Sequence, residues 1–335
     1  MDAFSEVLST VKLEGALFFN AEFSAPWGVT SPHSSCIAPH LVPGAEHLVI
    51  YHFVLEGSAS IRTESGEALQ LGPGDIVVFP HGDPHRMVCG SPAELMDTAA
   101  VLKSRVRRNL GPVSAGGGGE LTRFVCGYMA CDRRLCQLVL DGLPPMIKVN
   151  VHADDSGQWI ENSIRHLVEE AASATPGSSA MLAKLSEALF VDTLRRYIAG
   201  LPTEQTGWLA GTRDPIVGKS LAILHSRPEH SWTIAELARE VGLSRSALVE
   251  RFSRYLSEPP MTYLARWRMQ LAARALGSTA RSVAQIGAEV GYESEASFNR
   301  AFKREFGVPP ARFRKDRRRH PDQLPPAAAS APAGL

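Results

Sequence analysis

One stretch of the sequence, Trp232–Phe313, contains the same pattern twice. Thr233–Gly242 reads TIAELAREVG, and Ser282–Gly291 reads SVAQIGAEVG about fifty positions later. Each copy then continues to a proline pair, Pro259–Pro260 in the first and Pro309–Pro310 in the second. A repeat of this length indicates a duplicated supersecondary unit.

Each copy predicts a helix, a tight turn and a second helix. Thr233 and Ser282 each stand three residues before a Glu or Gln, which is the spacing of a capping box at a helix start. Apolar residues then recur at helical spacing. Gly242 and Gly291 follow, where a left-handed residue is needed to end a helix.

A single long helix is predicted between the copies, over Pro260–Leu276, with arginines lying off its apolar stripe. The two copies and this arginine-bearing helix resemble an AraC/XylS-type DNA-binding domain over about residues 215–315. The resemblance implies two recognition helices that enter successive major-groove segments on one face of DNA. Such segments lie one helical turn apart, about 34 Å.

The outward positions of the second helix in each copy are expected to read bases. Arginine suits a guanine edge, asparagine suits adenine, and glutamate can accept from cytosine. The expected base-reading residues are Ser246, Val249, Glu250, Glu295, Ala296, Asn299 and Arg300. Residues expected on phosphates, through charge or a place at a helix N-terminus, are Thr233, Arg245, Arg251, Arg268, Ser282, Ser294 and Lys303.

The charge is divided unevenly along the chain. Residues 213–320 contain 20 Lys and Arg against 11 Asp and Glu, whereas the remainder contains 15 against 24. A basic C-terminal part beside an acidic one indicates nucleic-acid binding at that end. No apolar run is long enough to span a membrane. With no signal-peptide core and an odd number of cysteines, five, we expect a cytoplasmic, nucleoid-associated protein without a disulfide framework.

The first half of the chain predicts a small β-barrel. Residues 1–20 are expected to form a short helix, and Ala25–Ala38 is rich in turns. Short β segments separated by glycines follow at Leu48–Glu56, Ser58–Thr63, Ala68–Leu71 and Asp75–Pro80. The predicted fold class is therefore α+β in several domains, with a β-barrel and flanking helices followed by an all-α domain.

Gly74–His85 has the glycine, proline and histidine spacing of the second cupin motif. The first half thus resembles a cupin domain, and the whole chain is similar to AraC-type regulators with an N-terminal cupin-like sensor. The first cupin motif is incomplete, because Ile50 stands at its glutamate position and no His-x-His pair exists. Cys89 stands where the second motif usually has Asn. These departures argue against cupin enzyme chemistry.

Histidines and cysteines of the barrel are the candidates for an effector site: His47, His52, His85, Cys89 and Cys126. Three interpretations stay open: a metal ion completed by a cysteine, a polar effector held by imidazole hydrogen bonds, and histidines that only serve the fold. A thiol that reacts with an oxidant is a further alternative.

Two amphipathic helices are predicted at Trp159–Ala172 and Ser178–Ala199. They either cover the barrel or form a homodimer contact, as helices in this position do in AraC-type regulators. The predicted domains are a cupin-like sensor over 1–150, this helical segment over 151–200, a linker over 201–214, the DNA-binding domain over 215–316 and a disordered tail over 317–335.

Together these patterns predict a sequence-specific transcription regulator, not an enzyme, whose cupin-like domain senses a small molecule or a redox signal. The expected partners are double-stranded DNA, RNA polymerase, an effector or oxidant, and a second copy of the chain. The alternatives are a cupin metalloenzyme tethered to DNA and a constitutive DNA-binding protein with a degenerate sensor. Apart from the metal ion of one interpretation, no cofactor is expected.

Overall fold

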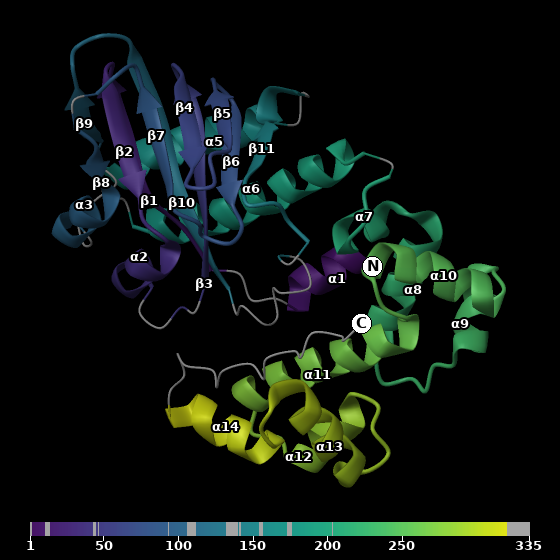
Figure 1. Cartoon of the computed structure of the whole chain (residues 1–335). Helices are drawn as coiled ribbons and strands as arrows, with labels where there is room; N and C mark the ends of the chain where they lie inside the picture. The colour runs from purple at the N-terminus through teal and green to yellow at the C-terminus, as the bar shows by residue number, and fades with distance from the viewer. Residues whose placement is uncertain are drawn as a thin grey trace. The chain divides into compact units, whose positions relative to one another are not determined.

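The computed structural model describes residues 2–319 except 11–13, 43–44, 46, 93, 106–111, 132–139, 141, 154–156, 173–175 and 203. The chain divides into two compact units (Figure 1). The barrel unit comprises Lys12–Arg133 and Leu143–Leu201, and the helical unit comprises Met1–Val11, Arg134–Gly142 and Pro202–Leu335.

The barrel unit is built from two sheets. Its strands are β1 (Glu14–Ser24), β2 (Trp27–Ser31), β3 (His47–Glu56), β4 (Ala59–Thr63), β5 (Ala68–Leu71), β6 (Asp75–Phe79), β7 (His85–Cys89), β8 (Met96–Asp97), β9 (Val113–Gly116), β10 (Leu121–Cys131) and β11 (Ile147–Asn150). One sheet has the order β11-β6-β3-β10-β1-β9 and the other β5-β4-β7-β2-β8. Neighbouring strands are antiparallel except the β1–β9 and β2–β8 pairs. The predicted β-barrel is confirmed.

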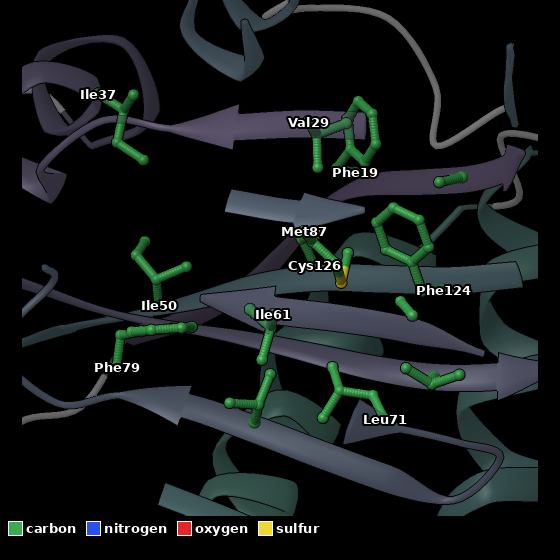
Figure 2. Close-up of a cluster of buried hydrophobic side chains, with 14 of the residues drawn as sticks. Phe19, Val29, Ile37, Ile50, Ile61, Leu71, Phe79, Met87, Phe124 and Cys126 are labelled. Atoms are coloured by element: carbon green, nitrogen blue, oxygen red, sulfur yellow. The ribbon is translucent and has the colours of Figure 1, made fainter. Parts of the chain in front are cut away.

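Apolar side chains from both sheets fill the space between them, as Figure 2 shows for Ile50, Ile61 and Phe124. Because side chains alternate along a strand, the other face of β10 packs differently. There Gly127 lies opposite Tyr51 in the β3–β10 ladder, and a Cβ at Gly127 would lie 2.1 Å from the tyrosine ring. The glycine therefore makes room for a fully buried aromatic residue.

Helices flank the sheets: α2 (Ser34–Leu41), α3 (Thr98–Arg105), α5 (Gly157–Ala172), α6 (Ser178–Gly200) and the short 3-10 helix η1 (Val151–Ala153). The long helix α6 packs on β1, β10 and β11, and α5 packs on α6. This packing agrees with the covering interpretation of the two amphipathic helices. Trp159 on α5 and Met181 on α6 nevertheless stay 54% exposed.

The N-terminal region differs from the sequence-based expectation. Only Ala3–Thr10 is helical (α1), whereas Glu14–Ser24 is a strand. Its buried residues Leu17, Phe19, Ala21 and Phe23 alternate with more exposed ones, which is the period of a strand rather than of a helix. The expected turn region Ala25–Ala38 contains β2 and the start of α2.

The helices of the helical unit are α1, α7 (Trp208–Arg213), α8 (Pro215–Ser226), α9 (Ile234–Val241), α10 (Arg245–Leu256), α11 (Pro260–Ser278), α12 (Val283–Glu289), α13 (Glu295–Phe306) and α14 (Pro310–Arg319). The first helix α1 packs against α7 and α8, although it precedes the barrel in the sequence. At the other end, α14 continues to Arg319, past the expected domain end at residue 316. Residues 320–335 of the predicted tail lie outside the described residues.

Within this unit α12, α13 and α14 gather around one end of α11 (Figure 1). Their shared core contains Ile286, Phe298, Phe302, Phe306 and Phe313, all at most 3% exposed. Nowhere in the described chain is a helix both long and apolar enough to cross a membrane.

Candidate nucleic-acid interface and sensor centre

Both copies of the repeat form a helix, a turn and a second helix, but their first helices begin differently. Ser282 and Gln285 form a complete capping box, with hydrogen bonds of 2.8 and 3.1 Å between each side chain and the other's backbone N–H. At α9 the box is half made, because Thr233 accepts from the Glu236 N–H at 3.2 Å. The Glu236 carboxylate instead bonds His230 Nε2 at 2.9 Å.

The turns have the predicted backbone conformation. Gly242 has φ of 75° and Gly291 of 85°, which is the left-handed region that glycine adopts without strain. In the second copy a Cβ added to Gly287 would lie 3.0 Å from the Phe298 ring. The absence of a side chain at Gly287 thus lets α13 cross α12 closely.

The helices α10 and α13 each bury one face and expose the other. Leu248, Phe252, Phe298 and Phe302 are completely buried. Of the expected base-reading residues, the exposed ones are Ser246, Glu250, Glu295, Ala296 and Arg300, and the half-buried ones are Val249 and Asn299. Each helix therefore offers a small polar face on the side away from its core.

The expected phosphate contacts fall into two groups. Thr233, Ser282 and Ser294 are N-cap residues of α9, α12 and α13, where backbone N–H groups and the helix dipole favour an anion. Arg245 and Lys303 are exposed on α10 and α13. The other two, Arg251 and Arg268, are half-buried and bond to other parts of the protein.

Arg251 forms an ion pair with Asp214, the N-cap residue of α8. Its Nε and Nη2 atoms donate to the carboxylate at 2.7–3.1 Å. The same carboxylate accepts from the backbone N–H groups of Ile216 and Val217. These bonds hold the pKa of Asp214 below its ordinary value, against the opposing effect of burial. Sequence reasoning missed this role, although Asp followed by Pro is a helix-start signal.

Arg268 joins the two helix–turn–helix copies. From α11, its Nε donates to the carbonyl oxygen of Pro228 at 2.6 Å and its Nη2 to that of His230 at 2.8 Å. Its Nη1 donates to Gly291 in the turn of the second copy at 3.4 Å. Pro228 and His230 precede α9, the first helix of the first copy. The guanidinium group thus fixes the loop of one copy beside the turn of the other.

A buried network holds α7 on the same unit. Trp208 Nε1 donates to the Tyr263 hydroxyl at 2.8 Å, and that hydroxyl bonds His225 Nε2 at 2.7 Å. The tryptophan can only donate, which leaves the hydroxyl proton of Tyr263 available to His225 Nε2. Burial lowers the pKa of His225 to about 4, which keeps its ring neutral at pH 7.

In the barrel unit, three of the five candidate effector residues come together. His52 Nδ1 lies 2.6 Å from Cys126 Sγ, and His52 Nε2 lies 2.7 Å from His85 Nε2. His85 Nδ1 lies 2.8 Å from the carbonyl oxygen of Asp83. All three side chains are at most 5% exposed, and the His85 ring stacks on Phe79.

The carbonyl of Asp83 determines which atom carries the proton in each hydrogen bond of the Cys126–His52–His85 chain. A carbonyl only accepts, so His85 Nδ1 carries the hydrogen and the Nε2 of a neutral His85 accepts. His52 Nε2 must then donate, which leaves His52 Nδ1 to accept from the Cys126 thiol. Burial supports this neutral arrangement, since it lowers the pKa of His85 to about 4 and that of His52 well below its ordinary value, and raises that of Cys126.

This arrangement is not that of a metal centre. His52 uses opposite ring nitrogens toward Cys126 and His85, so one ion cannot bind all three in the observed positions. Among the described residues, no group of three or more His, Cys, Asp or Glu is placed to hold a metal ion. His47 bonds the Pro80 carbonyl instead, and half-buried Cys89 pairs with Trp27 at the end of β7.

A basic helical unit with two helix–turn–helix copies and a two-sheet barrel with a buried histidine pair define a DNA-binding protein with an attached cupin-like domain. Comparisons with known proteins agree. A family model described as "Cupin" matches residues 2–199, and one described as "Helix-turn-helix domain" matches residues 237–316.

A "Putative AraC-like transcription regulator" of Streptomyces antibioticus is 30% identical, over 94% of this chain and 99% of that one. The transcriptional regulator AlkR of Acinetobacter baylyi is 28% identical over the same shares. The solved DNA-binding domain of AdpA, in complex with a target DNA, is 25% identical, covers 33% of this chain and 99% of its own, and has a TM-score of 0.31.

The chain belongs to the AraC-type family of transcription regulators with an N-terminal cupin domain. It binds DNA through its helix–turn–helix domain and is not an enzyme. The alternative of a cupin metalloenzyme tethered to DNA is therefore set aside.

Proposed function

We propose that the protein regulates transcription by reading two adjacent major-groove segments with α10 and α13. The observation that carries this proposal is the Arg268 bridge, because a fixed relation between the two copies is needed to match two segments at once. The exposed faces with Arg300, Asn299 and Glu250 would contact base edges. Such a protein would act at the nucleoid in the cytoplasm.

The test is a binding-site selection with the wild-type chain and Arg300→Ala. We expect Arg300→Ala to lose about 1–3 kcal/mol of specific binding and to relax the preference at one base pair. Glu240→Ala, an exposed change on α9 outside the proposed reading face, is the control. An unchanged preference in Arg300→Ala would show that this face of α13 does not enter the groove.

For the barrel unit, we propose a sensor centred on the Cys126–His52–His85 chain. A polar effector would replace one of its hydrogen bonds and so shift the strands β3, β7 and β10 that carry the three residues. The oxidant alternative is less favoured, because the nucleophilic form of cysteine is the thiolate and burial raises the pKa of Cys126.

Reporter expression from the native promoter tests the sensor, with operator binding measured in parallel. His52→Ala and His85→Ala should abolish the response to the effector while the helical unit still binds DNA. If Cys126→Ser or Cys89→Ser removes an oxidant response and His85→Ala does not, the thiol alternative is correct. Full inducibility of all four variants would mean a constitutive DNA-binding protein or a signal received elsewhere.

Homodimer formation and contact with RNA polymerase remain proposals. The exposed Trp159 on α5 and Met181 on α6 support a dimer contact on the helices that flank the barrel, since aromatic residues and methionine are enriched at protein–protein interfaces. Sedimentation of the full chain with and without Trp159→Glu tests it. A dimer that persists in the variant places the contact elsewhere.

A further inference from the structure

The helical unit contains a cavity of about 510 Å³ between α10, α11 and α13 and the start of α7. Its wall includes Trp208, Tyr255, Arg266, Gln270 and Glu305. This volume falls in the range of small-molecule sites, about 300–1,000 Å³. The cavity uses none of the residues expected to contact DNA, and it lies outside the barrel unit.

Gln270 is the first sign that this cavity binds a ligand. It is 5% exposed, yet its Oε1 atom accepts no hydrogen bond from the part of the chain that the structure describes. A buried carbonyl oxygen without a donor costs about 1–3 kcal/mol. A leucine or methionine would fill the same space on α11 without that cost. The presence of an amide therefore indicates a hydrogen-bond donor that comes from a ligand.

The charges of the wall indicate which donor fits. Arg266 pairs with Glu258 at 2.5 Å and lies over the Tyr263 ring. Glu305 is exposed and has no ion pair with any residue in the described ranges, although the positive charges of Arg266 and Arg304 act on its carboxylate. The wall therefore has an unpaired carboxylate and an unpaired amide oxygen, both acceptors. Arg266 Nε is a buried donor without an acceptor, so a ligand that fits this wall also carries one oxygen atom to accept its hydrogen bond.

We propose that this cavity binds a small primary amine that also carries a hydroxyl or carbonyl oxygen. The ammonium group would donate to Gln270 Oε1 and to the Glu305 carboxylate, and the oxygen would accept from Arg266 Nε. Because α10 belongs to the first helix–turn–helix copy and α13 to the second, such a ligand stabilises one placement of the two copies. The helical unit thus has a small-molecule input of its own, separate from the barrel.

The test measures binding of ethanolamine to the full chain by calorimetry at pH 7, in the absence of DNA. Choline is the matched control ligand, because it keeps the hydroxyl and the positive charge but has no N–H group. We expect choline to bind at least about tenfold more weakly, and Glu305→Gln and Gln270→Met each to weaken ethanolamine about tenfold. Glu240→Gln, which changes an exposed carboxylate on α9, should leave the affinity unchanged.

Equal binding of ethanolamine and choline would overturn the proposal, as would wild-type affinity in both Glu305→Gln and Gln270→Met. Thermal melting shows whether each variant is folded. If Gln270→Met unfolds, Glu305→Gln decides, since it replaces one oxygen with nitrogen at the cavity wall. DNA reading is measured separately with Arg300→Ala. A failure of the amine-binding proposal is therefore distinguishable from a failure of the proposed DNA contacts.

Discussion

Arg268 on α11 donates a 2.8 Å hydrogen bond to the carbonyl oxygen of His230, in the loop before α9. Through the same guanidinium group it reaches Gly291, in the turn of the second helix–turn–helix copy. An arginine of the linker helix was expected on DNA. It instead determines where the two DNA-reading helices lie relative to each other.

Replacing Arg268 by alanine should weaken binding to a complete operator without changing its salt dependence. The variant loses about 1–3 kcal/mol of unfolding free energy, because three backbone carbonyls lose a charged donor. The slope of log affinity against log salt should stay at its wild-type value. Lys303→Ala, on exposed α13, is the matched comparison and should lower that slope by about one. Equal slope changes in the two variants would place Arg268 on a phosphate.

Gly287→Val should destabilise the second copy by about 1–3 kcal/mol. A side chain there meets the Phe298 ring at 3.0–3.2 Å, where the aromatic core has no room to move aside. Ala288→Val, one residue further on the exposed face of α12, serves as the control and should be near neutral. Urea denaturation followed by circular dichroism measures both, and similar midpoints for the two variants would contradict the close crossing.

Acidification should destabilise the barrel unit between about pH 6.5 and pH 4. The pKa of His85 is lowered to about 4 in the folded chain and returns to its ordinary value of 6.5 on unfolding. Below pH 6.5 the unfolded state therefore binds a proton that the folded state does not, and up to about 3 kcal/mol is lost by pH 4. The contribution of His85 then levels off, while His52, whose pKa burial also lowers, adds a further loss of the same sign.

His85→Phe keeps a ring beside Phe79 and removes the titrating group. Its melting temperature should fall less steeply with pH than that of the wild type, whatever its absolute value. His225, which has a similarly low pKa in the helical unit, is present in both chains and cancels in the comparison. Parallel pH profiles for the two chains would rule out His85 as the responsible group.

A fragment of the helical unit should be more stable when it keeps α7. Trp208 is buried and donates to Tyr263, so a fragment that starts at residue 213 loses a large aromatic side chain and leaves Tyr263 with one partner fewer. We expect residues 202–319 to be more stable than residues 213–319 by about 3 kcal/mol. Thermal melting and operator binding of the two fragments measure the difference.

The repeat made the helical unit predictable from the sequence. Periodicity, caps and turn glycines are local signals, and they placed α9 to α13 within two residues of their observed ends. The capping box at Thr233 was predicted from the same local spacing and is only half formed, because His230 competes for the Glu236 carboxylate. Sequence spacing does not include such a competitor.

The long-range pairs could not be read from the sequence. Arg251 meets Asp214 across 37 positions, and His52 meets Cys126 across 74. All five candidate effector residues lie on β3, β7 or β10, yet only His52, His85 and Cys126 come together, since the β3–β10 ladder places His52 opposite Cys126. The register between distant strands depends on the whole sheet. The sequence could therefore predict which residues are candidates, but not which of them lie within hydrogen-bond distance of each other.

The Arg268 bridge bonds only to main-chain carbonyl oxygens, those of Pro228, His230 and Gly291. Every amino acid supplies such an oxygen, so the side chains at Pro228 and His230 can change while the bridge persists. Gly291 must stay a glycine, because an added Cβ would lie 2.8 Å from Arg268 Nη2. Substitutions on the exposed faces of α10 and α13 also leave the bridge intact. A lineage of such proteins can therefore acquire new operator sequences through base-contacting residues alone, while the distance between the two half-sites stays constant.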